Sequence, residues 1–205
     1  MKLYILGTNT DNKGMQLELL TTDMLKKQGY INISANIVSS GGSEVDAIAI
    51  QRQILGKENI DTQIICECKA LNRPININDW MKFIGKVYVE KLKNELTIGL
   101  FIALSGANGN VIGSYTDIRN RNCPFIKLMA GDDIIAFLTN EYSLAPALKI
   151  ESHIKMFTDK SISVINLAYY EKSVYWIIGF VEGGFTILKK DANLLKDQEL
   201  KTILE

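Results

Sequence analysis

The sequence predicts an α/β protein built around a mixed β-sheet. Segments with helical spacing of apolar residues alternate with segments of strand-like spacing along the 205 residues. The run Leu96–Leu104 is almost wholly apolar, which is typical of a strand buried on both faces of a parallel sheet. Apolar residues make up 47% and charged residues 22% of the chain, so the composition is that of a folded globular protein rather than a disordered one.

The first part of the chain predicts a helix followed by strands. Apolar residues recur three and four positions apart over about Gly14–Gln28, and Gly29 ends this helix. Ser39–Ser43 is expected to form a turn and the polar stretch Gln51–Asp61 a hairpin loop. Strands are expected where apolar and polar residues alternate, over Ile31–Val38, Glu44–Ile50 and Thr62–Lys69.

The next part continues the alternation of helices and strands. Asn78 or Asp79 is expected to cap a helix that runs to about Leu92 and buries Trp80. The elements expected after it are the buried strand Leu96–Leu104, a helix over Val111–Arg119, a strand over Phe125–Leu128 and a helix over Asp132–Asn140.

The last third of the chain predicts a small appended unit. The composition shifts near Tyr142–Lys149, so we expect a main domain over residues 1–145 and an extension over residues 146–205 that serves oligomerisation or partner docking. The extension is predicted to be α+β, with a strand meander and a closing helix over Ser161–Tyr170, Val174–Val181, Phe185–Leu188 and Asp191–Leu204.

Charge and composition exclude several classes of protein. Lysine plus arginine and aspartate plus glutamate both number 23, so no strong cationic field attracts nucleic acid by itself. No window of apolar residues is long enough to span a membrane, and the first ten residues lack the features of a signal peptide. Three cysteines and one histidine fit neither a disulfide framework nor a zinc site. We therefore expect a reduced, cytoplasmic protein without a membrane partner.

The feature that points to chemistry is a set of charged residues on neighbouring strands. Residues i and i+2 of a strand project from the same face, so Glu67 and Lys69 point the same way, and Asp46 can share that face. Two carboxylates plus a backbone carbonyl suit a hard cation such as Mg²⁺. A nearby lysine can orient or deprotonate a water bound to the ion. This set of groups suits phosphodiester hydrolysis.

A solvated strand face is the alternative interpretation, because charged residues alternate on many exposed strands. Three features favour a site instead. Ile65 shares the face with Glu67 and Lys69, Gly41-Gly42 precedes the acidic strand and lets backbone approach a ligand, and Glu18 on the first helix can add a carboxylate.

The run from about Gly14 to Val87 resembles the PD-(D/E)xK restriction-endonuclease-like superfamily, most closely its Mrr-like branch. The segments that carry the resemblance are Lys13-Gly14 with Glu18, Gly29-Tyr30, residues 41–46, residues 64–70 and the helix around residues 80–85. Val45 stands where the name of the motif has proline. The resemblance implies a restriction-endonuclease-like core, with a central mixed sheet flanked by helices, over residues 1–145.

The resemblance also implies an activity and roles for single residues. It implies an Mg²⁺-dependent DNA endonuclease, with Mn²⁺ as a substitute ion, in which Asp46, Glu67 and the backbone carbonyl of Cys68 bind the metal. Lys69 is then the catalytic lysine and Glu18 an accessory ligand. The candidate DNA contacts are Lys82, Lys86, Arg119 and Arg121, each of which also fits a solvated helix face or loop.

The biological setting follows from the resemblance rather than from the residues. Because such sites cut one strand each, we expect a homodimer or higher oligomer, or a module of a larger protein, that acts on DNA in restriction or anti-phage defence. A structure-selective nuclease for repair or recombination junctions is an alternative. So is a catalytically inactive DNA-binding or assembly module with the same fold.

Overall fold

The computed structural model of the protein describes residues 1–38, 44–121 and 125–195. The chain divides into two compact units, Leu17–Gly131 and a second unit made of Met1–Gln16 with Asp132–Glu205. The structure thus divides the chain after residue 131, whereas the boundary expected from the sequence follows residue 145. None of the helices in the described part of the chain is long and apolar enough to cross a membrane.

The unit Leu17–Gly131 contains a mixed sheet with the strand order β2-β3-β4-β5-β6. The first strands, β2 to β4, pair antiparallel, whereas β4, β5 and β6 pair parallel. The mixed α/β core predicted from the sequence is therefore confirmed. The strands run over Ile31–Val38 (β2), Glu44–Leu55 (β3), Glu58–Lys69 (β4), Ile98–Ala103 (β5) and Ile126–Ala130 (β6).

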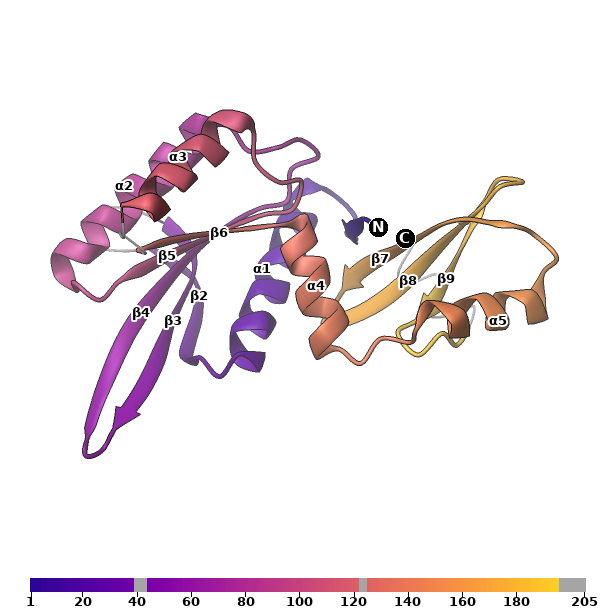
Figure 1. Ribbon diagram of the computed structural model, residues 1–205, viewed down its shortest axis with the longest axis horizontal. Helices are drawn as coiled ribbons and strands as arrows, with labels where there is room; N and C mark the ends of the chain where they lie inside the picture. Colours follow the sequence, from indigo (N-terminus) through magenta and orange to yellow (C-terminus); the bar gives the residue numbers. More distant parts are fainter. Residues whose placement is uncertain (39–43, 122–124, 196–205) are drawn as a thin grey trace. The chain divides into compact units, whose positions relative to one another are not determined.

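Helices cover both faces of this sheet (Figure 1). Helices α2 (Ile77–Lys93) and α3 (Gly109–Asn120) lie on one face, and α1 (Thr10–Lys27), whose first residues belong to the other unit, lies on the opposite face. Burial of apolar side chains stabilises both layers. The buried side chains of the first layer include Trp80, Phe83, Phe101 and Val111, and those of the second include Leu25, Ala47, Ala49 and Cys66.

The second unit contains a smaller sheet with the strand order β1-β7-β8-β9. Strand β1 pairs parallel with β7, and the other neighbours pair antiparallel. Its strands run over Leu3–Ile5 (β1), Ile162–Tyr170 (β7), Ser173–Phe180 (β8) and Phe185–Lys189 (β9), and its helices are α4 (Gly131–Glu141) and α5 (Ala147–Phe157). The predicted strand meander is confirmed.

The predicted hairpin loop over residues 51–61 is wrong, because β3 and β4 continue through it as paired strands to a turn at Gly56-Lys57. Arg52 and Asp61 face each other across these strands, and the guanidinium donates to the carboxylate at 2.7 and 2.6 Å. Neither β2 nor β5 extends beside this stretch. Most of the described side chains in this stretch are also exposed, so both of its faces are open to water and the alternation of apolar residues that usually reveals a strand is weak here.

Other boundaries also differ from the sequence predictions. The N-cap of α2 is Asn76, whose side chain accepts hydrogen bonds from the backbone of Asn78 and Asp79 in a capping box. The short strand β1 and helix α5 were not predicted from the sequence. The closing helix predicted over residues 191–204 is wrong for residues 191–195, which form a turn and a bridge to Leu188. Its remainder, like the predicted turn at residues 39–43, lies outside the described residues.

Gly99 on β5 provides a test of how tightly α2 packs on the sheet. A Cβ added at Gly99 would overlap Val87 and lie 3.0 Å from Phe83 Cζ, and both side chains are buried on α2. We expect Gly99→Ala to lower the free energy of unfolding by about 1 to 3 kcal/mol, because the core must be overpacked. The matched control is Gly85→Ala on α2, where nothing lies within 4 Å. That variant should raise the free energy of unfolding by about 0.5 to 1 kcal/mol in urea denaturation.

Candidate active site at the adjoining ends of β3 and β4

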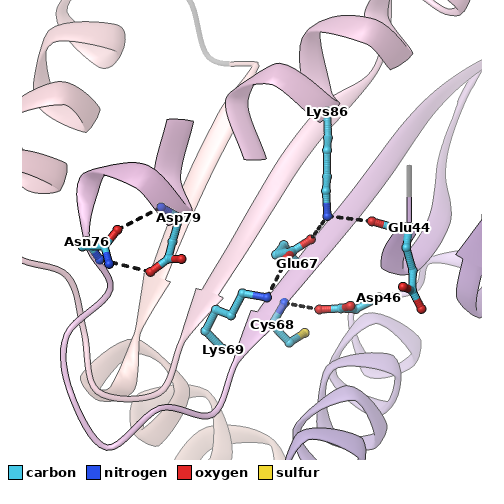
Figure 2. A network of polar contacts seen from close by, with 8 residues as sticks. All are labelled: Glu44, Asp46, Glu67, Cys68, Lys69, Asn76, Asp79 and Lys86. Atoms are coloured by element: carbon cyan, nitrogen blue, oxygen red, sulfur yellow. Dashed lines mark hydrogen bonds and ion pairs between the residues drawn. The ribbon is translucent and has the colours of Figure 1, made fainter. Parts of the chain in front are cut away.

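Charged side chains from β3, β4 and α2 meet where β3 begins and β4 ends (Figure 2). The antiparallel register pairs Ala47 with Cys66, so Asp46 and Glu67 come from neighbouring positions on adjacent strands. The Asp46 carboxylate accepts a hydrogen bond from the backbone N–H of Cys68 at 2.6 Å. Residues predicted from the sequence to form one site therefore lie in one place.

Glu67 is at the centre of this network, and its side chain is only 10% exposed. Its Oε1 accepts from Lys69 Nζ at 2.7 Å, and its Oε2 accepts from Lys86 Nζ, also at 2.7 Å. Lys86 reaches this position from α2 and donates in addition to the backbone carbonyl of Glu44 at 2.6 Å. A buried carboxylate that carries two ammonium partners is well compensated for its loss of hydration.

Asp46 is less well compensated than Glu67. Burial is the largest effect on the Asp46 carboxyl and raises its pKa, and repulsion from Glu67 raises it further. The hydrogen bond from Cys68 and the attraction to Lys69 and Lys86 lower the pKa, but the net result is a rise. The folded protein thus favours the protonated form of Asp46 relative to an exposed aspartate. Additional positive charge at this position would favour the ionised form.

Lys69 keeps its proton in this arrangement. Burial lowers the pKa of its ammonium group, but the hydrogen bond and the attraction to Glu67 outweigh that effect, so the pKa rises overall. A protonated lysine donates hydrogen bonds and neutralises negative charge, whereas it cannot accept a proton. The sequence left two roles open for Lys69, to orient a water molecule or to deprotonate it. A protonated Lys69 fits the first role better than the second.

The carboxylate of Glu18 approaches the same network from α1. Burial and the nearby charge of Asp46 raise the pKa of the Glu18 carboxyl, and a hydrogen bond with Asn36 opposes this rise. Helix α1 also contacts the end of β4 through Thr21, whose hydroxyl lies 3.1 Å from Cys68 Sγ. The helix thereby places a further acidic side chain near Asp46.

The donor atoms at this site have the chemistry of a site for a hard cation. The N–H and C=O of a strand residue point to the same side, so the Cys68 carbonyl is directed toward the side of Asp46, which its N–H contacts. Carboxylate and carbonyl oxygens are the ligands that Mg²⁺ prefers. Within the described residues, no group of three metal-binding side chains is already assembled. The oxygens of Glu67 contact lysine ammonium groups instead.

The cysteines beside Glu67 belong to the core rather than to the chemistry. Cys66 and Cys68 are both buried and free of disulfide bonds. Burial, with a smaller contribution from the charge of Asp46, raises the pKa of the Cys66 thiol to about 12. Such a thiol stays neutral at physiological pH and is not a nucleophile.

The predicted DNA contacts have different positions. Lys82 is exposed on α2, one turn before Lys86. The Arg119 guanidinium lies over the Tyr115 ring, 5.7 Å from its centroid, and Arg121 caps the C-terminus of α3. In the part of the chain that the structure describes, no hydrogen bond or ion pair connects these three residues to Asp46 or Glu67. Lys86 differs from these three residues, because its ammonium forms an ion pair with Glu67.

The role of Lys86 as a partner of Glu67 was missed from the sequence, although a signal for it exists. Phe83 and Val87 of the buried stripe on α2 flank Lys86. A lysine at the edge of such a stripe extends its aliphatic stem over the neighbouring sheet and places its ammonium at the border. This position places the Lys86 ammonium at the border of the sheet, where it contacts Glu44 and Glu67, but it does not identify these two residues as the partners.

Comparison with known proteins gives one family match. The family model Mrr_cat, described as a restriction endonuclease, matches residues 10–138. Similar solved structures include the DNA modification-dependent restriction endonuclease AspBHI, with 13% sequence identity, a TM-score of 0.45, and coverage of 59% of this chain and 30% of that chain. The restriction endonuclease MspJI in complex with a 27-mer oligonucleotide has 14% identity, a TM-score of 0.44, and coverage of 62% and 28%. The chain therefore spans less than a third of either enzyme, and none of the curated proteins matches it.

Proposed function

The chain belongs to the restriction endonuclease family that the Mrr_cat model describes, and from this premise we propose that it is a metal-dependent endonuclease that hydrolyses phosphodiester bonds in DNA. The observation that carries the proposal is the convergence of Asp46, Glu67 and Lys69 at the adjoining ends of β3 and β4. Carboxylates and a protonated lysine at one place are what a phosphodiester hydrolase needs.

Asp46, Glu67 and the backbone carbonyl of Cys68 would hold the cation, which is Mg²⁺ or, as a substitute, Mn²⁺. Glu18 supplies an accessory carboxylate from α1. When bound, the ion lowers the pKa of a water molecule and stabilises negative charge on phosphate oxygens. Glu67 is buried and Asp46 is half-buried, and removal from water strengthens their electrostatic attraction to a cation.

Lys69 has a distinct role in the proposed reaction. Its ammonium donates to Glu67 in the structure, and in the proposed reaction it would donate to the attacking water or to a phosphate oxygen. We expect Lys69→Met to lower the rate of cleavage by about 10²- to 10⁴-fold, while the affinity for Mn²⁺ is retained. Single-turnover cleavage of a labelled duplex measures the rate. Lys93→Met is the control, because Lys93 pairs with Glu90 on α2 at 2.7 Å, and its rate should match that of the wild type.

The DNA-binding surface and the assembly are further parts of the proposal. The net charge is zero, so specific contacts rather than a general cationic field must hold DNA. Lys82, Arg119 and Arg121 are the proposed contacts to the DNA backbone, a role suited to lysine and arginine. A homodimer or higher oligomer, with residues 146–205 as the oligomerisation or docking segment, would allow both strands to be cut. We propose defence against foreign DNA as the biological setting.

A plasmid cleavage assay tests the proposed function. The wild type is incubated with supercoiled plasmid in Mg²⁺, in Mn²⁺ and in chelator, and the same assay is repeated with a four-way junction. Nicking or linearisation that requires the divalent ion supports the endonuclease. Exclusive cleavage of the junction supports the repair or recombination alternative. Binding of DNA without cleavage in either metal supports the inactive DNA-binding module and contradicts the proposed function.

A further inference from the structure

Lys86 is held in the structure in the way that a metal ion would be held. Its ammonium contacts a carboxylate oxygen of Glu67 at 2.7 Å and the backbone carbonyl oxygen of Glu44 at 2.6 Å. These are the two kinds of oxygen that bind hard divalent cations in proteins. Figure 2 shows the side chain of Lys86 extending from α2 to this position between the two strands.

Both carboxylate oxygens of Glu67 have a cationic partner in the structure without any ion. The carboxylates of Asp46 and Glu67 stand beside the ammonium groups of Lys69 and Lys86, and each oxygen of Glu67 carries one ammonium contact. A divalent cation that binds Glu67 in this state would share the carboxylate with two positive groups. Like charges a few ångströms apart in a partly buried place repel each other strongly, so one ammonium has to leave.

Of the two lysines, Lys86 is the one that can leave without a change in the strand. Lys69 lies two residues from Glu67 on the same strand, and both side chains project from the same face. The strand itself therefore keeps the Lys69 ammonium near the Glu67 carboxylate. Lys86 belongs to a helix, and its side chain is 25% exposed. Rotation of its long side chain toward the solvent breaks the hydrogen bonds with Glu67 and Glu44, the two that its ammonium makes within the described residues.

We propose that Lys86 pairs with the Glu67 carboxylate in the metal-free protein and that a divalent cation displaces it on binding. The displaced ammonium is then free to contact a phosphate group of the DNA. This inference rests on the proposed function, because it takes Asp46 and Glu67 as the metal ligands. Lys86 is then a positioning residue for Glu67 before the metal binds and a phosphate contact afterwards. The exchange couples occupation of the metal site to affinity for the substrate.

The first test measures metal binding without DNA. Mn²⁺ is titrated calorimetrically into the wild type, Lys86→Met and Lys93→Met. Lys93 is the matched control because it forms a pair of the same length with Glu90 on the same helix. Loss of the competing ammonium should tighten Mn²⁺ binding to Lys86→Met by about fivefold, the size expected for a partly exposed ion pair, whereas Lys93→Met should match the wild type. Unchanged or weaker binding to Lys86→Met would overturn the inference.

The second test uses the wild type alone and therefore does not depend on how a variant folds. Lysine side chains are modified with an amine-reactive ester with and without Mn²⁺, and the extent of modification at each lysine is read by mass spectrometry. Reactivity at Lys86 should rise by about threefold or more when Mn²⁺ binds, since an ammonium held in an ion pair is protected, and reactivity at Lys93 should not change. Mn²⁺ binding with unchanged reactivity at Lys86 overturns the inference and leaves the endonuclease proposal standing. Absence of both Mn²⁺ binding and plasmid cleavage overturns both.

Discussion

Replacement of Asp46 by asparagine is expected to abolish DNA cleavage and, at the same time, to stabilise the metal-free protein. Loss of a carboxylate ligand removes several kcal/mol of transition-state stabilisation that a bound ion supplies, which corresponds to a fall of at least about 10³-fold in rate. The asparagine side-chain oxygen can still accept the hydrogen bond from Cys68 N–H. Single-turnover cleavage and thermal denaturation in chelator measure the two effects.

The sign of the stability effect follows from the raised pKa of Asp46. Burial and the neighbouring Glu67 raise the pKa of this carboxyl in the folded protein against the opposing contacts. Its contribution to stability is therefore full below the pKa in the unfolded chain and is lost as the pH rises through the folded-state pKa. Asparagine avoids that loss, so the gain over the wild type should be largest at neutral pH. It should disappear below about pH 4, where the unfolded aspartate is protonated too.

The matched control is Asp61→Asn, which removes a carboxylate paired with Arg52 on the exposed hairpin. There, the hydrogen bond and the charge of Arg52 lower the pKa of the carboxyl, so its neutralisation should slightly destabilise the protein, and cleavage should be unaffected. Wild-type cleavage by Asp46→Asn would remove this residue from the proposed active site. A lower melting temperature for Asp46→Asn in chelator would contradict the electrostatic account of the site.

Replacement of Glu67 by glutamine should have the opposite effect on stability and the same effect on cleavage. The neutral side chain leaves the ammonium groups of Lys69 and Lys86 without the carboxylate that compensates for their partial burial. The free energy of unfolding is expected to fall by about 1 to 3 kcal/mol, and cleavage should fall below detection with the loss of a metal ligand. Urea denaturation in chelator and plasmid cleavage in Mg²⁺ measure the two effects.

The control for Glu67→Gln is Glu90→Gln, which removes a carboxylate that pairs with one lysine, Lys93, in the part of the chain that the structure describes. Its effect on stability should be smaller, since Lys93 is 45% exposed and can be hydrated by water. The double variant Glu67→Gln with Lys86→Met should recover part of the lost stability, because one uncompensated ammonium is removed. Equal losses for Glu67→Gln and Glu90→Gln would show that Glu67 is not the centre of the charge network.

The parts of the site that obey short-range rules could be predicted from the sequence. Glu67 and Lys69 are two residues apart on one strand, so the alternation of strand side chains is sufficient to place them on one face. Strand β5 is recognisable from its apolar run, which reflects burial on both sides of the sheet. The pairing that brings Asp46 beside the end of β4 requires only that consecutive strands be antiparallel neighbours.

The features that could not be predicted from the sequence depend on long-range packing or on exposure. The contact of Lys86 with Glu67 joins a helix to a strand 19 residues away, and periodicity fixes only the face of a helix, not the strand residue opposite it. The hairpin at Gly56-Lys57 has two solvated faces, so its strands show no consistent apolar alternation. Helix α5 buries Ile150 and Ile154, whereas its other large apolar residues, Leu148, Met156 and Phe157, are exposed, so its apolar residues do not mark a single buried face.

Binding of Mn²⁺ to the protein without DNA shows whether Asp46 and Glu67 hold the metal ion. Electron paramagnetic resonance reports the free ion as it is titrated with the wild type, Asp46→Asn, Glu67→Gln and Asp61→Asn. We expect the wild type and Asp61→Asn to deplete the signal of free Mn²⁺ equally, and Asp46→Asn and Glu67→Gln to leave it almost unchanged. Equal depletion by all four proteins would contradict the claim that these two carboxylates hold the ion.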